Sequence, residues 1–202
     1  MKALILIDIQ NDFIPGGALA VPGGETIIPL VNQLQGQFDL VVATQDWHPA
    51  HHKSFASQHP GKNVFETVDL HGMDQVLWPD HCVQGTEGAD FSPLLEMNRV
   101  EAIFRKGTDP EIDSYSGFFD NGYRKSTAMG VYLRGKGVKE VYLVGLAADY
   151  CVYFTALDAL KEGFATHFIE EATRPISPEG FEKAKADLAS KGGNILPVNT
   201  LL

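Results

Sequence analysis

The stretch Val144-Gly-Leu-Ala-Ala-Asp-Tyr-Cys-Val152 links an apolar run to a helical pattern. The run Val141–Val144 is apolar throughout, which is typical of a parallel strand buried on both faces. Downstream, the apolar side chains at 154, 157 and 160 recur at helical spacing and predict the inner face of a helix. Gly145 permits a tight turn between the two elements. The stretch therefore predicts a strand–turn–helix unit, with Cys151 in the first turn of the helix.

The predicted position of Cys151 favours a reactive thiol. The first turn of a helix offers free backbone N–H groups and the positive end of the helix dipole, and both favour thiolate over thiol. Asp149 is a suitable N-cap for the same helix. An isolated cysteine is more often buried and inert, so a structural role stays open on this stretch alone. The residues that follow the other strands decide between the two interpretations.

Strands and helices alternate along the whole chain. Apolar runs predict six strands, at Ala3–Ile7, Leu40–Ala43, Ala102–Phe104, Val141–Val144, Thr166–Ile169 and Ile195–Val198. Helical patterns between them imply a parallel sheet that is covered on both faces. We therefore expect an α/β fold with three layers, α/β/α, around a mostly parallel six-stranded sheet. The third strand is expected to be central, and Pro197 places the sixth at an edge.

Length and composition restrict the class of protein. The 202 residues fit one medium domain, so we expect a single domain over 1–202. The formal net charge of −10 argues against nucleic acid or an anionic membrane as the main partner. Two cysteines are too few for a disulfide scaffold, and the N-terminal apolar run is too short to span a bilayer. We expect a cytoplasmic protein, and the sequence predicts no oligomeric state.

Chemically active side chains follow four of the predicted strands. They are Asp8, Asp46 with His48, Lys106, and Cys151. In sheets of this kind, ligands bind beyond the carboxyl ends of the strands, so these side chains are expected at one edge. There Asp8 can accept the proton of Cys151, Lys106 can balance their charge, and N–H groups of the turn 147–151 can bind an oxyanion. Each of these residues taken alone also has an ordinary structural explanation.

A metal site is expected at the same edge. Asp46 and His48 are two positions apart, so their side chains point the same way if the chain is extended. His81 lies in a turn next to a proline. Carboxylate and imidazole ligands suit zinc, iron or manganese. Among the other loop histidines only His52 is a candidate ligand, and we expect Cys82 to pack rather than to bind metal.

The long loops are expected to build a pocket. The irregular stretch Pro49–Gly88 is too long to be an idle connection inside a domain, and it indicates a functional excursion. Phe13, Trp78 and Tyr115 lie on loops that meet at the same rim. Three aromatic side chains there could enclose a flat ring, or could simply pack beneath the loops.

The same residues occur in five motifs that resemble one family. In chain order the motifs are Asp8-Ile9-Gln10-Asn11-Asp12-Phe13, Thr44-Gln45-Asp46-Trp47-His48, Trp78-Pro79-Asp80-His81-Cys82, Lys106-Gly107 and Gly145-Leu146-Ala147-Ala148-Asp149-Tyr150-Cys151-Val152. Together they resemble the nicotinamidase/pyrazinamidase branch of the isochorismatase-like cysteine hydrolases, over nearly the whole chain. Isochorismatases themselves lack the cysteine, and the related carbamoyl amidohydrolases share only the catalytic triad.

The resemblance implies a metal-dependent cysteine amidohydrolase with the Rossmann-like fold of its family. Such an enzyme converts nicotinamide to nicotinate and ammonia through a thioester in NAD salvage, and also acts on pyrazinamide. Asp8, Lys106 and Cys151 would be the catalytic triad. The N–H groups of Ala147 and Cys151 would form the oxyanion hole, after a cis peptide bond between Leu146 and Ala147.

The resemblance also implies a metal and a ring pocket. Asp46, His48 and His81 would bind one divalent ion, zinc in the first place, with iron or manganese as alternatives. His52 is the best match for a fourth ligand. The ring pocket would be lined by Phe13, Trp78 and Tyr115.

Three alternatives remain open from the residues. The first is another small-amide hydrolase of the same superfamily. The second is a zinc hydrolase in which metal-bound water attacks the substrate and Cys151 is a bystander. The third is a non-catalytic protein that binds a metal or ligand on this fold, because a fold does not fix a function.

Overall fold

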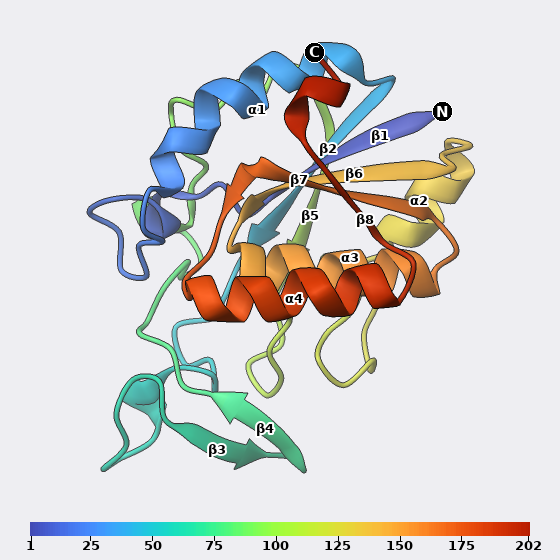
Figure 1. Ribbon diagram of the computed structural model, residues 1–202. Helices are drawn as coiled ribbons and strands as arrows, with labels where there is room; N and C mark the ends of the chain where they lie inside the picture. The colour runs from blue at the N-terminus through green and yellow to red at the C-terminus, as the bar shows by residue number, and fades with distance from the viewer.

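A six-stranded sheet forms the centre of the computed structural model, which describes residues 1–202 (Figure 1). Its strands are β1 (Lys2–Ile7), β2 (Leu40–Asp46), β5 (Val100–Lys106), β6 (Glu140–Leu146), β7 (Ala165–Arg174) and β8 (Asn194–Leu196). Their order is β5-β2-β1-β6-β7-β8, and every neighbouring pair is parallel. The carboxyl ends of all six strands therefore face the same side of the molecule.

Helices cover both faces of this sheet. They are α1 (Ile28–Leu34), α2 (Met129–Gly135), α3 (Tyr153–Lys161) and α4 (Pro178–Ser190). Figure 1 shows α3 and α4 side by side beneath the sheet and α1 above it. Alternate residues of β1 point to the two faces: Leu4 and Leu6 pack in the core with α1, whereas Ile5 and Ile7 pack in the core with α2, α3 and α4. The predicted three-layer α/β/α fold is confirmed.

The register between the central strands aligns their carboxyl ends. Ile7 in β1 lies opposite Thr44 in β2 and opposite Gly145 in β6. Gly145 is required there, because its φ is +120° and a Cβ would lie 2.1 Å from the carbonyl oxygen of Ile7. In the next pair, Asp46 lies opposite Lys106. Residues that follow these positions are thus held at one level of the sheet.

The two edge strands of the sheet are β5 and β8. The strand that contains residues 102–104 was expected to be central, and this is wrong: β5 is an edge strand. Its side chains alternate between exposed and half-buried, with Glu101, Ile103 and Arg105 exposed, because only one face of an edge strand meets the core here. The expectation that the last strand lies at an edge is confirmed by β8.

The buried face of α3 differs from the expected one. Phe154 is 37% exposed, and Leu157 and Leu160 are only half-buried. The fully buried positions are Thr155 and the two alanines that lie beside the expected face, Ala156 and Ala159. Small side chains let the helix lie close to the sheet, and the larger ones extend to its flanks.

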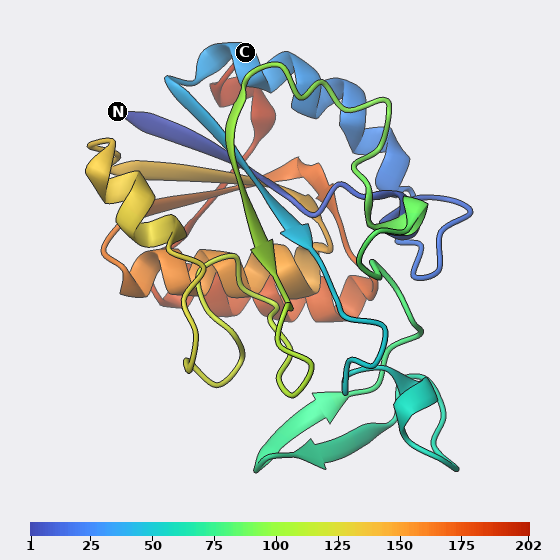
Figure 2. The same cartoon turned by 180° about the vertical axis from the view of Figure 1, so that it is seen from behind.

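The long excursion after β2 contains regular structure that the sequence did not predict. Strands β3 (Thr67–Leu70) and β4 (Met73–Val76) form an antiparallel hairpin apart from the main sheet (Figure 2). The two residues between them, His71 and Gly72, both have positive φ, of 56° and 82°. This is the two-residue turn that suits a hairpin, and the His-Gly pair was its sequence signal. None of the helices combines the length and the apolar character needed to cross a membrane.

Candidate active site and metal centre

The three residues predicted as a catalytic triad meet around one ammonium group. Nζ of Lys106 lies 2.8 Å from Oδ2 of Asp8 and 3.4 Å from Sγ of Cys151. All three side chains are buried. Lys106 ends β5, Asp8 follows β1, and Cys151 lies in the turn after β6, so the parallel strands bring them together. Nζ of Lys106 also lies 2.5 Å from Oδ1 of Asp46 and donates to the carbonyl of Ser114 at 2.9 Å.

Asp8 has an unusual backbone conformation and a fixed carboxylate. Its φ is +49°, a left-handed value that is uncommon for residues other than glycine. Its Oδ1 accepts a hydrogen bond from the hydroxyl of Thr44 at 2.7 Å. Oδ2 receives no aligned hydrogen bond and is held only by the ion pair with Lys106. One oxygen of Asp8 is therefore left free to accept a proton.

Burial and charge set the protonation states of this group. Burial alone would lower the pKa of Lys106, but the carboxylates of Asp46 and Asp8 outweigh it and raise that pKa well above its ordinary value. Burial raises the pKa of Asp8, against the effect of Lys106. Burial also raises the pKa of Cys151 well above its ordinary value, although Lys106 opposes this. Burial therefore acts against the thiolate that the first turn of a helix was expected to favour.

The turn that carries Cys151 differs from the predicted first turn of an α-helix. The peptide bond between Leu146 and Ala147 is cis, as the resemblance implied. Residues 148–152 form a π-helical turn that leads directly into α3, and the carbonyl of Ala147 accepts the N–H groups of residues 150 and 152. The predicted N-cap role of Asp149 is wrong. Its carboxylate instead accepts the backbone N–H groups of Ile176 and Ser177, at 2.9 and 2.8 Å, and so joins this turn to the start of α4.

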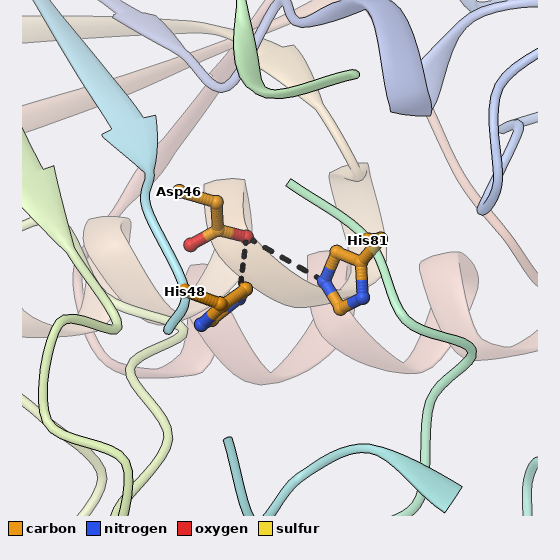
Figure 3. Close-up of side chains that lie close together, drawn as sticks. All are labelled: Asp46, His48 and His81. Atoms are coloured by element: carbon orange, nitrogen blue, oxygen red, sulfur yellow. Dashed lines mark ion pairs between the residues drawn. The ribbon is translucent and has the colours of Figure 1, made fainter. Parts of the chain in front are cut away.

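Asp46, His48 and His81 form a cluster next to the triad (Figure 3). Their potential ligand atoms all lie within 4.8 Å of one another. Oδ2 of Asp46 lies 3.6 Å from Nε2 of His48 and 3.9 Å from Nε2 of His81. Figure 3 shows both imidazole rings directed at this carboxylate. The three predicted ligands are thus brought together from β2 and the excursion.

The hydrogen bonds around this cluster prepare it for a cation. Nδ1 of His48 lies 2.9 Å from the carbonyl of Gly107, and Nδ1 of His81 lies 2.8 Å from the carbonyl of Pro79. A ring nitrogen at that distance from a carbonyl must carry the proton, which leaves the Nε2 lone pairs free to bind a metal. Burial, with the neighbouring His48, lowers the pKa of His81 to about 4. Burial would lower the pKa of His48 as well, but the carboxylate of Asp46 outweighs it and raises that pKa. One carboxylate and two imidazoles are a ligand set that fits a divalent ion such as zinc.

The predicted fourth ligand, His52, lies beside the cluster but outside it. Its ring centroid is 4.5 Å from that of His48, and its Nδ1 lies 2.7 Å from Oγ of Ser54. Its Nε2 is buried without a partner. His52 belongs to a separate group with His48 and Asp113. The structure therefore does not bring His52 together with Asp46 and His81.

Gln10 supports the cluster and was not recognised as a site residue. Its side chain is fully buried and acts on the backbone of Asp46. Oε1 accepts the N–H of Asp46, and Nε2 donates to the carbonyls of Asp46 and Ala89, each at 2.8 Å. Gln10 thus continues the pairing of β1 with β2 beyond the last backbone hydrogen bond. Its place two residues after Asp8 was the available signal.

A pocket opens onto both groups, because Cys151 of the triad and Asp46 and His81 of the cluster line it. The three predicted aromatic residues, Phe13, Trp78 and Tyr115, all line it, together with Cys151. The hydroxyl of Tyr115 accepts hydrogen bonds from Nε2 of Gln75 and Nε1 of Trp78, both at 3.2 Å, so the hairpin helps to hold this wall. The residues missed are Leu19, Asp113, Tyr150 and Ile176. Tyr150 precedes the cysteine directly, and the other three gave no local signal.

The cavity has the shape and lining of a site for a flat ring. The rings of Trp78 and Tyr150 meet edge to face with centroids 4.9 Å apart, and Phe13 lies 5.5 Å from His81. Apolar and aromatic walls enclose a few polar groups at one end, namely the thiol and the metal ligands. This arrangement is typical of a pocket for a small aromatic molecule with one reactive substituent.

Comparisons with known proteins agree with this geometry. The family model described as the isochorismatase domain matches residues 2–200. A nicotinamidase of Escherichia coli strain K12 is 44% identical over 200 residues, which cover 96% of this chain and 93% of that protein.

Two solved structures extend the comparison. An Acinetobacter baumanii nicotinamidase/pyrazinamidase has a TM-score of 0.97 at 47% identity and covers 100% of this chain and 98% of its own. A pyrazinamidase of Pyrococcus horikoshii, solved in complex with zinc, has a TM-score of 0.80 at 42% identity, with coverages of 97% and 98%. Because the family match runs through nearly all the residues that build the sheet and the site, the chain belongs to the isochorismatase-domain family.

Proposed function

We propose that the protein is a nicotinamidase, which hydrolyses nicotinamide to nicotinate and ammonia as a step of NAD salvage. The observation that carries this proposal is the meeting of Asp8, Lys106 and Cys151, with Cys151 also lining a pocket that has aromatic walls. The nicotinamidases among its relatives support the same reaction. Pyrazinamide has a ring of the same size and the same amide, so we expect it to be a substrate as well.

The first half of the reaction forms a thioester. The ring lies between Phe13 and Trp78, which directs the amide carbon towards Cys151. Sγ attacks this carbon while its proton passes to Asp8, and the carbonyl electron pair moves onto oxygen. The N–H groups of Ala147 and Cys151 bind the resulting oxyanion, and loss of one such donor typically raises a barrier by about 3–4 kcal/mol. Lys106 keeps the charges of the buried acid and sulfur balanced.

The second half releases both products. Asp8 gives its proton to the amide nitrogen, the C–N bond breaks, and ammonia leaves. Asp8 is then a carboxylate again and takes a proton from a water molecule that attacks the thioester. The C–S bond breaks, nicotinate forms, and the thiol of Cys151 regains its proton. Each step uses the same acid and the same sulfur.

Asp46, His48 and His81 would hold one divalent ion, with zinc as the first choice and iron or manganese as alternatives. When bound, the ion supplies a positive centre that attracts the pyridine nitrogen of the substrate. His52 is the weaker candidate for a fourth ligand. We also propose that residues 1–202 form one domain, because both apolar cores lie against the same sheet.

The test is ammonia release from nicotinamide by the purified protein, with a carbamoyl amide as the comparison substrate. We expect turnover of nicotinamide, strong preference over the carbamoyl compound, and no turnover by Cys151→Ala. Mass spectrometry of quenched enzyme should find a nicotinoyl adduct on Cys151. Full activity of Cys151→Ala would exclude the thioester route and favour attack by metal-bound water.

A further inference from the structure

We propose that Thr44 is a positioning residue for catalysis, whose hydroxyl holds the Asp8 carboxylate so that Oδ2 faces the thiol of Cys151. This inference rests on the proposed function. It assigns a role to a residue that touches neither the substrate pocket nor the metal cluster. Thr44 lies in β2, and its neighbour across the sheet is Ile7, the residue before Asp8.

The two oxygens of Asp8 have different partners. Oδ1 accepts the Thr44 hydroxyl at 2.7 Å, and both side chains are completely buried. Oδ2 lies 2.8 Å from Nζ of Lys106 and receives no aligned hydrogen bond. A carboxylate oxygen of Asp8 lies within 4.8 Å of Sγ of Cys151. The carboxylate of Asp8 is thus close to the thiol, and Oδ2 is the oxygen that no hydrogen bond occupies.

The carboxylate needs a second anchor because Lys106 does not fix its rotation. The terminal torsion of an aspartate is broad and roughly two-fold, so partners must choose its orientation. The ammonium of Lys106 is a compact charge with rotatable donors, and it is shared with Asp46 and the carbonyl of Ser114. The Thr44 hydroxyl donates its one proton to one oxygen of Asp8, and this hydrogen bond fixes the rotation of the carboxylate.

Packing fixes the direction of the Thr44 hydroxyl itself. A β-branched side chain has few allowed rotamers. The Thr44 methyl lies close against Gly117, where an added Cβ would lie only 2.6 Å from it. With the methyl held on that side, the hydroxyl is directed at Asp8. The methyl of Thr44 thus restricts its own rotamer, and its hydroxyl orients the carboxylate of Asp8.

The consequence is specific to the proton-transfer steps. In the attack, the S–H bond breaks, its proton bonds to Oδ2 and its electron pair forms the C–S bond. In the release of ammonia the same proton moves from Oδ2 to nitrogen. A rotated carboxylate would slow both transfers, whereas the ring pocket and the metal cluster would be unchanged. Loss of the hydroxyl should therefore lower kcat and leave KM almost unaltered.

The experiment compares Thr44→Val and Thr44→Ser with the wild-type enzyme. Valine keeps the shape and loses the donor, whereas serine keeps the donor and loses the methyl. We expect kcat of Thr44→Val for nicotinamide to fall roughly 10- to 100-fold with KM close to wild type, as for a misplaced catalytic group. Thr44→Ser should retain most of kcat. Metal content and melting temperature are measured alongside, and both should stay close to wild type in the two variants.

Several outcomes would overturn the inference. A kcat of Thr44→Val close to wild type would do so, and so would an equal fall in Thr44→Val and Thr44→Ser. If Thr44→Val does not fold, Thr44→Ser and Thr44→Ala form a second pair that differs only in the hydroxyl, and equal kcat values would overturn it. Cys151→Ala separates this inference from the proposed function, because an inactive Cys151→Ala beside a fully active Thr44→Val removes only the role of Thr44.

Discussion

The carboxyl-terminal edge of the sheet and the excursion that follows β2 both contribute to one pocket, but they hold their side chains in different ways. At the sheet edge, continuous parallel pairing places Asp8, Lys106 and Cys151 at one level. In the excursion, Trp78 is held by an isolated bridge with Phe55, and His81 lies two residues before Val83, which forms an isolated bridge with His48. The positions of the reacting groups thus depend on strand register. The positions of one wall of the ring pocket and of one metal ligand depend on a loop.

This difference predicts which properties a substitution in each region should change. A change at the sheet edge alters elements that share a core with the whole molecule, so it should affect stability and activity together. A change in the excursion alters a segment whose strands lie apart from the main sheet, and it should affect metal or substrate binding while the domain stays folded. Four substitutions test this comparison, in order of expected effect.

Lys106→Met should have the largest effect. It leaves the buried carboxylates of Asp8 and Asp46 without their cation, and breaking a buried ion pair typically costs about 3–5 kcal/mol. We expect a large fall in the free energy of unfolding, measured in urea, and loss of ammonia release. The control is Lys136→Met, which removes an exposed pair with Glu101 and should cost less than about 1 kcal/mol. A stable, active Lys106→Met would refute the importance of this edge.

Gly145→Ala should come next. The added methyl would lie 2.1 Å from the carbonyl oxygen of Ile7, so β1 and β6 must move apart just before Asp8 and Cys151. Overpacking of this kind costs about 1–3 kcal/mol, and the positive φ adds to the cost. Melting temperature and kcat should both fall. Gly135→Ala is the matched control, because nothing lies within 4 Å of its added Cβ. Equal melting temperatures of the two variants would contradict the prediction.

The features of the sheet edge differ in how far the sequence predicts them. Apolar runs predicted the strands, and the parallel fold then placed the residues after them at one edge, so Asp8, Lys106 and Cys151 could be grouped without coordinates. The edge position of β5 could not be predicted, because a short apolar run of three residues looks the same in the centre and at the border of a sheet. The direction in which the pKa of Cys151 is shifted could not be predicted either, because it depends on burial and on two carboxylates from other strands.

The excursion was harder to predict for the same reason that it is easier to perturb. Its hairpin is local and had a His-Gly turn signal, but its attachment to the site depends on single contacts between residues far apart in the chain. Gln75 meets Tyr115 through one side-chain hydrogen bond, and Trp78 meets the same hydroxyl through another. Such contacts have no periodicity, so no pattern in the sequence predicts them.

His81→Ala should affect metal binding and leave the fold intact. It removes one imidazole of the three-residue cluster, and even the loss of a residue that only supports a ligand typically lowers metal affinity about 10- to 100-fold. Competition with a chromogenic chelator for zinc should find at least that loss, while the melting temperature of the metal-free protein changes little. The control is His71→Ala, at the exposed hairpin turn. Unchanged zinc affinity in His81→Ala would remove this residue from the proposed metal site.

Gln75→Leu should have the smallest effect and the most selective one. Nε2 of Gln75 donates to the hydroxyl of Tyr115 and to Oδ2 of Asp113, so leucine frees one wall of the ring pocket without touching the reacting groups. The loss of one such hydrogen bond is worth about 1 kcal/mol, which corresponds to a rise in KM of roughly fivefold. Steady-state kinetics should find this rise with kcat close to wild type, and Asp74→Asn, on the exposed side of the same hairpin, should change neither. A fall in kcat with KM unchanged would mean that the hairpin acts on the chemistry, and the division between edge and excursion would no longer hold.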